Sequence, residues 1–151
     1  LPFKINLYAD KREEQKDVSE KSIKGLHILL AEDNELNMEI SEFVLRNEGA
    51  DVTKAWNGQE AVERFRKSRV GEFNVILMDI MMPVKNGYEA ARLIRSLDRE
   101  DAKTIPIIAM TANAFTEDRI RAKEAGMDEH VAKPVDVELL IKVIHKLVKY
   151  D

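Results

Sequence analysis

Residues 74–83 read NVILMDIMMP, an apolar run that is closed by one acid, Asp79, and then followed by further apolar residues. Three other strand-sized apolar runs also end in polar or charged residues. Those terminal residues are Glu32 with Asp33, Thr111, and Lys133. Stability alone does not explain why four buried strands should each end in such a group. In open parallel sheets ligands bind at that edge, so the sequence predicts one site assembled from four strands.

Strand-like and helix-like segments alternate from Gly25 onward. The expected strands are Leu26–Ala31, Ala50–Ala55, Asn74–Met78, Pro106–Met110 and Glu129–Ala132. The expected helices are Asn34–Asn47, Gly58–Lys67, Gly87–Leu97, Thr116–Ala125 and Asp136–Lys149. Repeated βαβ units predict a parallel sheet that is covered on both faces. We expect an α/β fold, a flavodoxin-like (βα)5 three-layer sandwich with five parallel strands in the order 2-1-3-4-5.

Three expectations concern the ends and faces of single helices. In the first helix, the periodicity predicts a core-facing stripe of Leu36, Ile40, Phe43 and Val44. At the start of the second helix, Asn57 and Glu60 have the spacing of a capping box. The helix expected over 116–125 has only a thin apolar face, which is typical of an element of low local stability.

Composition bounds the class of protein. The chain has 151 residues, enough for one domain with some excess. Its net charge of −4 argues against a nucleic-acid-binding domain. It contains no cysteine, which excludes disulfides and thiolate metal sites. No apolar run reaches the roughly 20 residues of a membrane span. We therefore expect a cytoplasmic domain without direct membrane contact, which is compatible with a membrane-anchored parent protein.

Residues 1–24 differ from the rest of the chain. The first eight alternate apolar and polar residues like a strand, and the following stretch is highly charged with few apolar residues. We interpret 1–24 as a linker that carries a strand of a preceding domain, and 25–151 as the domain itself. The alternative is an extra helix docked on this domain.

The expected site brings three carboxylates together, from Glu32, Asp33 and Asp79. Two like charges about 4 Å apart repel by about 4 kcal/mol at an effective dielectric of about 20. Lys133 offsets part of this repulsion, and Mg²⁺, which binds carboxylates and phosphate, offsets more. With the hydroxyl of Thr111, the set suits a transferring phosphoryl group. Asp79 is the best candidate nucleophile, giving an aspartyl phosphate.

Four segments of the chain resemble the receiver domain of two-component response regulators. They are LLAEDN (29–34), VILMDIMMPVKNG (75–87), PIIAMTANA (106–114) and HVAKPVD (130–136). The resemblance runs from 25 to 150, and AEDNELN and MTANAF are most similar to receivers of hybrid sensor histidine kinases. The initial LPF resembles the closing strand of a kinase ATP-binding domain, which would make 1–24 the junction between kinase and receiver.

The resemblance implies that Asp79 accepts a phosphoryl group from a phosphohistidine. It also implies a set of Mg²⁺ ligands around that residue. Asp33 and Asp79 would bind the ion directly, Glu32 would bind it through water, and Met81 would contribute its backbone carbonyl. Met81 has no polar side chain with which to orient an attacking water.

The resemblance further implies that Lys133 contacts the phosphoryl oxygens, that Thr111 turns inward to hydrogen-bond them, and that small Ala112 leaves room beside them. A cis peptide bond is expected before Pro134. His130 stands where the family usually has Tyr or Phe, three residues before Lys133. This departure argues against a simple aromatic rotation as the switch and introduces a titratable group at that position.

The implied partners are a histidine kinase domain, in the same or another chain, and a His-containing phosphotransfer protein. The domain would catalyse only its own phosphorylation and dephosphorylation, and the parent protein would be a histidine kinase. No DNA-binding segment follows Asp151 in this sequence, so we expect phosphoryl relay or intramolecular control as the output.

Three other functions compete with this reading. A phosphatase of the haloacid dehalogenase type also uses an aspartyl phosphate, but Met81 replaces the second acid of its Asp-x-Asp signature. A nucleotide- or flavin-binding domain would need a Gly-rich phosphate loop after the first strand, where 32–34 read Glu-Asp-Asn. A pseudo-receiver that only binds partners is distinguished by whether Mg²⁺ binds.

Overall fold

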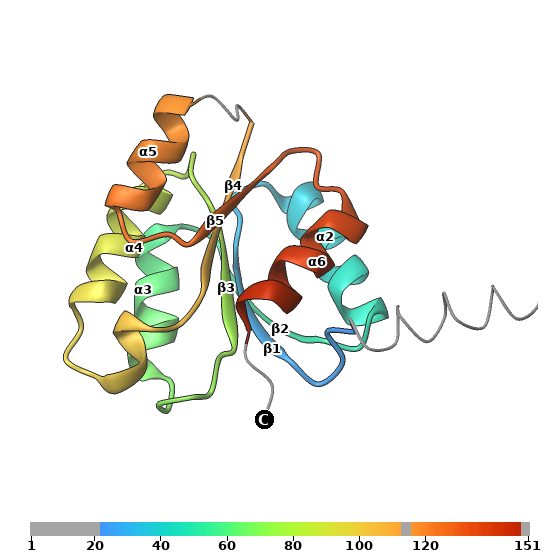
Figure 1. The fold of residues 1–151 in the computed structure, drawn as a ribbon, viewed down its shortest axis with the longest axis horizontal. Helices are drawn as coiled ribbons and strands as arrows, with labels where there is room; N and C mark the ends of the chain where they lie inside the picture. Colours follow the sequence, from blue (N-terminus) through green and yellow to red (C-terminus); the bar gives the residue numbers. More distant parts are fainter. Residues whose placement is uncertain (1–21, 113–115, 149–151) are drawn as a thin grey trace, which may run out of the picture.

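The computed structural model describes residues 22–112 and 116–148, and it contains a five-stranded parallel sheet in the order β2-β1-β3-β4-β5 (Figure 1). The strands are β1 (His27–Ala31), β2 (Asp51–Ala55), β3 (Val75–Asp79), β4 (Ile107–Thr111) and β5 (Glu129–Ala132). The helices are α2 (Glu35–Asn47), α3 (Gly58–Lys67), α4 (Gly87–Ser96), the 3-10 helix η1 (Glu100–Lys103), α5 (Thr116–Glu124) and α6 (Val137–Leu147). The predicted flavodoxin-like topology is confirmed.

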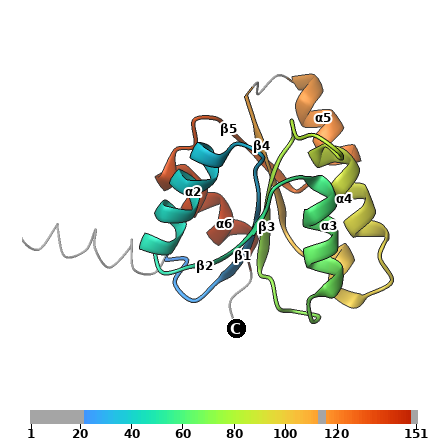
Figure 2. The same cartoon turned by 180° about the vertical axis from the view of Figure 1, so that it is seen from behind.

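The helices cover the sheet on both faces. α3, α4 and α5 lie on one face, and α2 and α6 lie on the other (Figures 1 and 2). Alternate strand residues point to opposite faces, so β1 places Leu29 in the core under α3 and α4 and Ile28 in the core under α2 and α6. Both faces are therefore apolar, which explains why the strands read as nearly continuous hydrophobic runs.

β3 is an interior strand of the sheet. All five of its residues are buried, and it pairs with β1 on one side and β4 on the other. In the register, Met78 lies opposite Ala31 and Asp79 lies opposite Met110. The strand therefore delivers Asp79 to the carboxyl edge of the sheet between the ends of its two neighbours.

The predicted core face of α2 was wrong. Leu36, Ile40 and Phe43 are 64%, 54% and 71% exposed, whereas Met38 and Leu45 are buried against the sheet. The helix carries apolar residues on two opposite faces, and periodicity alone cannot say which of them meets the sheet. Packing selects the face, because Met38 and Leu45 join the apolar core between α2, α6 and the sheet. Val44, also in the predicted stripe, is half-buried.

The predicted capping box of α3 is only half formed. The side chain of Asn57 accepts a hydrogen bond from the Glu60 N–H at 2.8 Å, as expected. The Glu60 carboxylate, however, accepts from the N–H of Trp56 at 3.4 Å instead of returning to Asn57. A complete box forms at α4 between Asn86 and Glu89. Asn86, next to Gly87, therefore caps α4 in addition to forming a turn.

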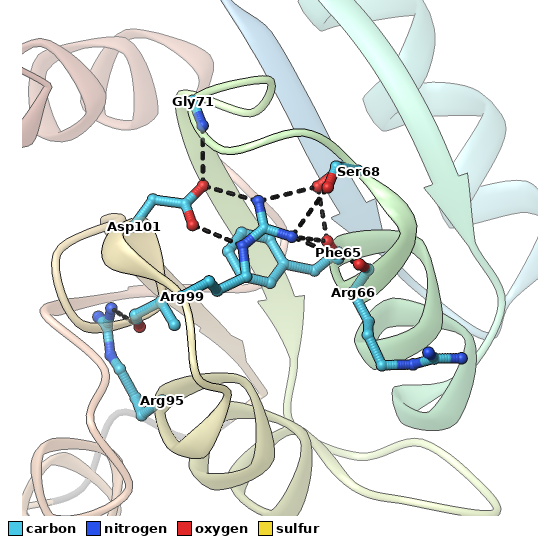
Figure 3. Close-up of polar contacts among 8 residues, drawn as sticks. Phe65, Arg66, Ser68, Gly71, Arg95, Arg99 and Asp101 are labelled. Carbon is cyan, nitrogen blue, oxygen red and sulfur yellow. Dashed lines mark hydrogen bonds and ion pairs between the residues drawn. The ribbon is translucent and has the colours of Figure 1, made fainter.

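Arg99 contacts three segments (Figure 3). The loop before β3 and η1 before β4 place these contacts at the amino edge of the sheet, whereas Asp79 lies at the carboxyl edge. The Arg99 guanidinium donates two hydrogen bonds to Asp101, at 2.6 and 2.9 Å, and lies 4.3 Å from the centre of the Phe65 ring. It also donates to the carbonyls of Phe65 and Ser68, which end α3. Asp101 in turn accepts from the Gly71 N–H. The cluster ties α3 and the loop before β3 to η1.

Residues 1–21 lie outside the described part of the chain, so the linker predicted for 1–24 and its alternative of a docked helix remain predictions. Within the described residues, no helix combines the length and the apolar composition that a membrane crossing needs.

Candidate functional site

Four strand ends meet at the carboxyl edge of the sheet. Glu32 follows β1, Asp79 ends β3, Thr111 ends β4, and Lys133 follows β5. The registers explain the arrangement, because β3 pairs with both β1 and β4, and Thr111 lies opposite Ala132. Glu32, Asp79 and Thr111 are the buried polar residues of the described core. The fold therefore brings Glu32, Asp79 and Lys133 into contact at this edge and places Thr111 at the end of the neighbouring strand.

Lys133 bridges two of the acids. Its ammonium nitrogen Nζ lies 2.7 Å from Oε2 of Glu32 and 2.9 Å from Oδ2 of Asp79. The remaining oxygens of both carboxylates accept backbone hydrogen bonds. Oε1 of Glu32 accepts from the Asn34 N–H at 3.2 Å, and Oδ1 of Asp79 accepts from the Met81 N–H at 3.3 Å. Each acid is thus held in one orientation by a cation and an amide.

Burial and neighbouring charges shift the acid–base equilibria of this pair. The pKa of the Asp79 carboxyl is raised to about 6. Burial is the largest cause, the hydrogen bond from Lys133 acts in the opposite direction, and the nearby charge of Glu32 adds to the effect of burial. Burial alone would lower the pKa of Lys133, but its bonds to Glu32 and Asp79 outweigh burial and raise it. At neutral pH the site therefore holds an ionised Asp79 beside a charged Lys133.

Three carboxylates gather closely enough to share one cation. Oxygen atoms of Glu32, Asp33 and Asp79 all lie within 4.8 Å of one another. Opposite ligands of an octahedral Mg²⁺ are about 4.2 Å apart, because each Mg–O bond is about 2.1 Å. The limit of 4.8 Å exceeds this span, so the arrangement fits one ion with a water between it and one of the acids. Three acids and one lysine also leave a net formal charge of −2, which a divalent cation balances. The donor set, hard oxygens without nitrogen or sulfur, fits Mg²⁺.

The remaining predicted site residues lie around this cluster. Thr111 is buried at the end of β4, and Ala112 follows it at the surface. Met81 exposes its side chain in the loop after β3, while its N–H contacts Asp79. The peptide bond between Lys133 and Pro134 is cis, as the resemblance implies.

His130 lies apart from the carboxylates. It pairs in register with Ala109 inside β5 and is half-buried, with its Nδ1 3.7 Å from a carboxylate oxygen of Glu129. Together with Arg119 and Met127 it lines a hollow of about 280 Å³ between α5 and β5. The structure therefore places His130 beneath α5 and outside the acid cluster.

A larger cavity opens beside the site, between α2 and α6. Its volume is about 390 Å³, and mostly apolar side chains line it, including Ile40 and Val44 of α2 and Leu140 of α6. Glu32 and Lys133 lie at its inner end. Sequence reasoning missed this cavity because it had assigned Ile40 to the core.

The loop after Asp79 has two features that the sequence did not reveal. Val84 adopts a positive φ of 68°, which is unfavourable for a β-branched residue. The carbonyl of Lys85 accepts a hydrogen bond from the Gly58 N–H at the start of α3, at 3.1 Å. The only sequence signal for this contact is the glycine itself, since glycine often marks a close backbone approach.

Known proteins share this fold and these motifs. The family model described as "Response regulator receiver domain" matches residues 28–145. Hybrid signal transduction histidine kinase M of Dictyostelium discoideum is 44% identical over 122 residues, which is 80% of this chain and 5% of that protein. The chain spans 7% and 13% of the length of two further curated relatives.

Two solved structures bear on the site. The receiver domain of sensor histidine kinase PA1611 from Pseudomonas aeruginosa PAO1, with a magnesium ion coordinated in its active site cleft, is 39% identical with a TM-score of 0.73. The match covers 82% of this chain and 97% of that one. The receiver domain of Ssk1, co-crystallised with the histidine phosphotransfer protein Ypd1 of Saccharomyces cerevisiae, is 30% identical with a TM-score of 0.71, covering 82% and 88% of the two chains.

Proposed function

The chain belongs to the response regulator receiver family of two-component systems, and from that membership we propose that Asp79 is its phosphoacceptor. The observation that carries the proposal is the environment of this carboxylate. Asp79 is 4% exposed, it contacts Lys133 at 2.9 Å, and it shares its surroundings with two further acids. No structural need explains an ionised acid in that position, whereas a nucleophile next to a cation has a chemical role.

The proposed reaction is transfer of a phosphoryl group from a phosphohistidine. An oxygen of the Asp79 carboxylate forms a bond to phosphorus while the bond between phosphorus and the donor imidazole nitrogen breaks. The electron pair of the broken bond stays on the imidazole nitrogen. Lys133 lies close enough to exchange its contact with Asp79 for one with the incoming phosphoryl oxygens. Thr111 and Ala112, at the end of β4, border the same space.

Mg²⁺ is the proposed cofactor. Asp33 and Asp79 would hold it directly, Glu32 would do so through water, and Met81 would add its backbone carbonyl. When bound, it would neutralise charge on the phosphoryl oxygens. The P. aeruginosa receiver with magnesium in its cleft supports this assignment.

The proposed partner is a His-containing phosphotransfer protein or a histidine kinase domain. The exposed stripe of α2, formed by Leu36, Ile40 and Phe43, begins next to the acid cluster and offers an apolar surface for it. Glu35 and Glu39 are exposed on the same helix, so a matching partner surface would be apolar with basic residues around it. The complex of the Ssk1 receiver with Ypd1 supports this kind of partner. We further propose that 25–151 forms the receiver and that 1–24 connects it to a kinase domain, in the cytoplasm.

Labelling by a small phosphodonor tests the acceptor. Acetyl phosphate with Mg²⁺ should add one phosphate to the protein, measured by intact mass, and Asp79→Asn should abolish this. Asp98→Asn, which changes an exposed acid between α4 and η1, is the matched control and should label like the wild type. Labelling that survives Asp79→Asn would refute the assignment.

A further inference from the structure

We propose that Gly58 is a positioning residue for the site, acting through the backbone carbonyl of Lys85 to fix the loop that carries Met81. The loop comprises residues 80–86, between β3 and α4. The inference rests on the proposed function, because that function gives the loop its role as the provider of a metal ligand.

The loop contains a strained turn. The Lys85 N–H donates to the Pro83 carbonyl at 2.8 Å, so a three-residue turn closes around Val84. With a φ of 68° at its centre, this is the γ-turn of positive φ, which is the rarer and less stable of the two forms. Val84 is β-branched and 76% exposed, so its own side-chain packing does not stabilise the conformation. Contacts elsewhere must hold the turn.

Gly58 supplies such a contact. It is the first residue of α3, where helical N–H groups have no partner within the helix. Its N–H finds that partner in the Lys85 carbonyl, at 3.1 Å. The approach is possible only for glycine, because a Cβ at this position would lie 2.2 Å from the Lys85 oxygen and 2.8 Å from its carbonyl carbon. The loop therefore caps α3, and α3 fixes the end of the turn.

The other end of the loop is held against the phosphoacceptor strand. The Gly87 N–H donates to the Ile80 carbonyl at 2.9 Å, and a Cβ on Gly87 would lie 2.5 Å from the Asp79 carbonyl oxygen. Met82 is buried in the core under α3 and α4. Met81 lies between these anchors, and its N–H contacts Oδ1 of Asp79. Because both ends of the loop are held, a displacement of the Lys85 backbone is expected to displace Met81 as well.

A methyl group at position 58 would displace the Lys85 carbonyl by roughly 1 Å, since ordinary contacts need about 3.5 Å. Residues that orient metal ligands from outside the coordination shell typically change metal affinity by about 10–100-fold. We expect Gly58→Ala to weaken Mg²⁺ binding by about tenfold and to slow labelling by acetyl phosphate at limiting Mg²⁺. Saturating Mg²⁺ should restore the labelling, which a general loss of folding would not allow.

The experiment compares four proteins: wild type, Gly58→Ala, Gln59→Ala and the double variant Gly58→Ala/Val84→Gly. Titration calorimetry with MgCl2 gives the dissociation constant, and amide hydrogen exchange without metal reports on residues 80–86. Gln59→Ala is the matched control, a neighbouring change in the same half-buried turn of α3. Val84→Gly removes the unfavourable φ at the centre of the turn, so the turn depends less on contacts elsewhere. The double variant should therefore recover part of the Mg²⁺ affinity that Gly58→Ala loses, and it is the fallback if Gly58→Ala alone does not fold.

Faster exchange in 80–86 and weaker Mg²⁺ binding in Gly58→Ala, with Gln59→Ala unchanged and Mg²⁺ binding partly restored in Gly58→Ala/Val84→Gly, is the expected result. Wild-type exchange in this loop for Gly58→Ala would overturn the proposal, as would equal effects of Gly58→Ala and Gln59→Ala. A wild type that binds no Mg²⁺ would refute the proposed cofactor instead, and the metal-free exchange would still decide whether Gly58 fixes the loop.

Discussion

The Asp79 side chain lowers the stability of the fold that carries it. Its pKa is raised to about 6, against 3.8 for an ordinary aspartate, mainly because the carboxyl is buried. Between these two pH values the folded protein binds more protons than the unfolded chain. Stability therefore falls as pH rises through this range, and the full penalty applies above about pH 6. A buried carboxylate that is kept ionised for use as a nucleophile therefore reduces the stability of the folded state.

We therefore expect Asp79→Asn to be more stable than the wild type at pH 7.5 without Mg²⁺, by roughly 1–2 kcal/mol, because asparagine does not ionise. The gain should vanish near pH 4, where the wild-type carboxyl is already protonated. Denaturant unfolding at both pH values measures it, with Asp98→Asn as the control. A gain of the same size at both pH values would contradict this account of Asp79.

At single positions, the sequence was informative about chemistry and silent about backbone geometry. Glu32, Asp79 and Lys133 could be predicted because each directly follows or ends an apolar strand, and parallel strands bring such positions to one edge. The strained turn at Val84 could not be predicted, because nothing in a Pro-Val-Lys segment demands a positive φ. That conformation depends on contacts with α3, which is distant in the sequence.

Among the elements, α3 and η1 depend on one arginine. Arg99 donates to Asp101 with both arms of its guanidinium and also to the carbonyls at the end of α3 (Figure 3). Both side chains are largely buried. Burial would raise the pKa of Asp101, but hydrogen bonds from Arg99 and from the Gly71 N–H lower it. Both groups of the pair are thus ionised and have hydrogen-bond partners. Removal of one partner from such a buried pair is strongly destabilising, because it leaves the other charge buried and unpaired.

We expect Arg99→Lys to reduce the free energy of unfolding by about 2 kcal/mol, because an ammonium cannot reproduce the planar fork. Labelling of the folded variant by acetyl phosphate should be unchanged, since the cluster lies at the opposite edge of the sheet from Asp79. Arg66→Lys is the control, because Arg66 also pairs with an acid, Glu63, but on the exposed surface of α3. Equal stability of the two variants would show that the fork is not needed.

The helices show which parts of an element a sequence can predict. The positions of the five α-helices agreed with the predicted ranges to within two residues, because hydrophobic periodicity and capping residues mark them locally. The 3-10 helix η1 was not predicted. The orientation of α2 could not be predicted in this way. Met38 and Leu45 lie on one face and Leu36 and Phe43 on the other, and only packing on the sheet selects between them. The exposed face, with Leu36 and Phe43, is the one that we propose for partner binding.

At the scale of the whole molecule, the strand order and the place of the site follow from one rule. Alternating strands and helices give a parallel sheet, and right-handed crossovers then leave few possible orders. The contact between Gly58 and Lys85 follows from no such rule, because it joins the first residue of α3 to the loop before α4, and their distance depends on the side chains packed beneath them. The same holds for the cavity between α2 and α6.

The two faces of the molecule allow a direct test of where a phosphodonor protein docks. Ile40 on α2 and Ile120 on α5 are 54% and 53% exposed, and they lie on opposite faces of the sheet. Ile40→Asp should slow transfer from phosphorylated Ypd1 of S. cerevisiae by at least about tenfold, because a charge in the centre of an apolar interface is poorly tolerated. Ile120→Asp should leave this transfer unchanged, and both variants should accept phosphate from acetyl phosphate at the wild-type rate. Equally fast transfer in both variants would refute α2 as the docking surface for this class of partner, as would a wild type that accepts no phosphate from Ypd1. A parallel fall in labelling by acetyl phosphate would instead show that the substitution damages the site.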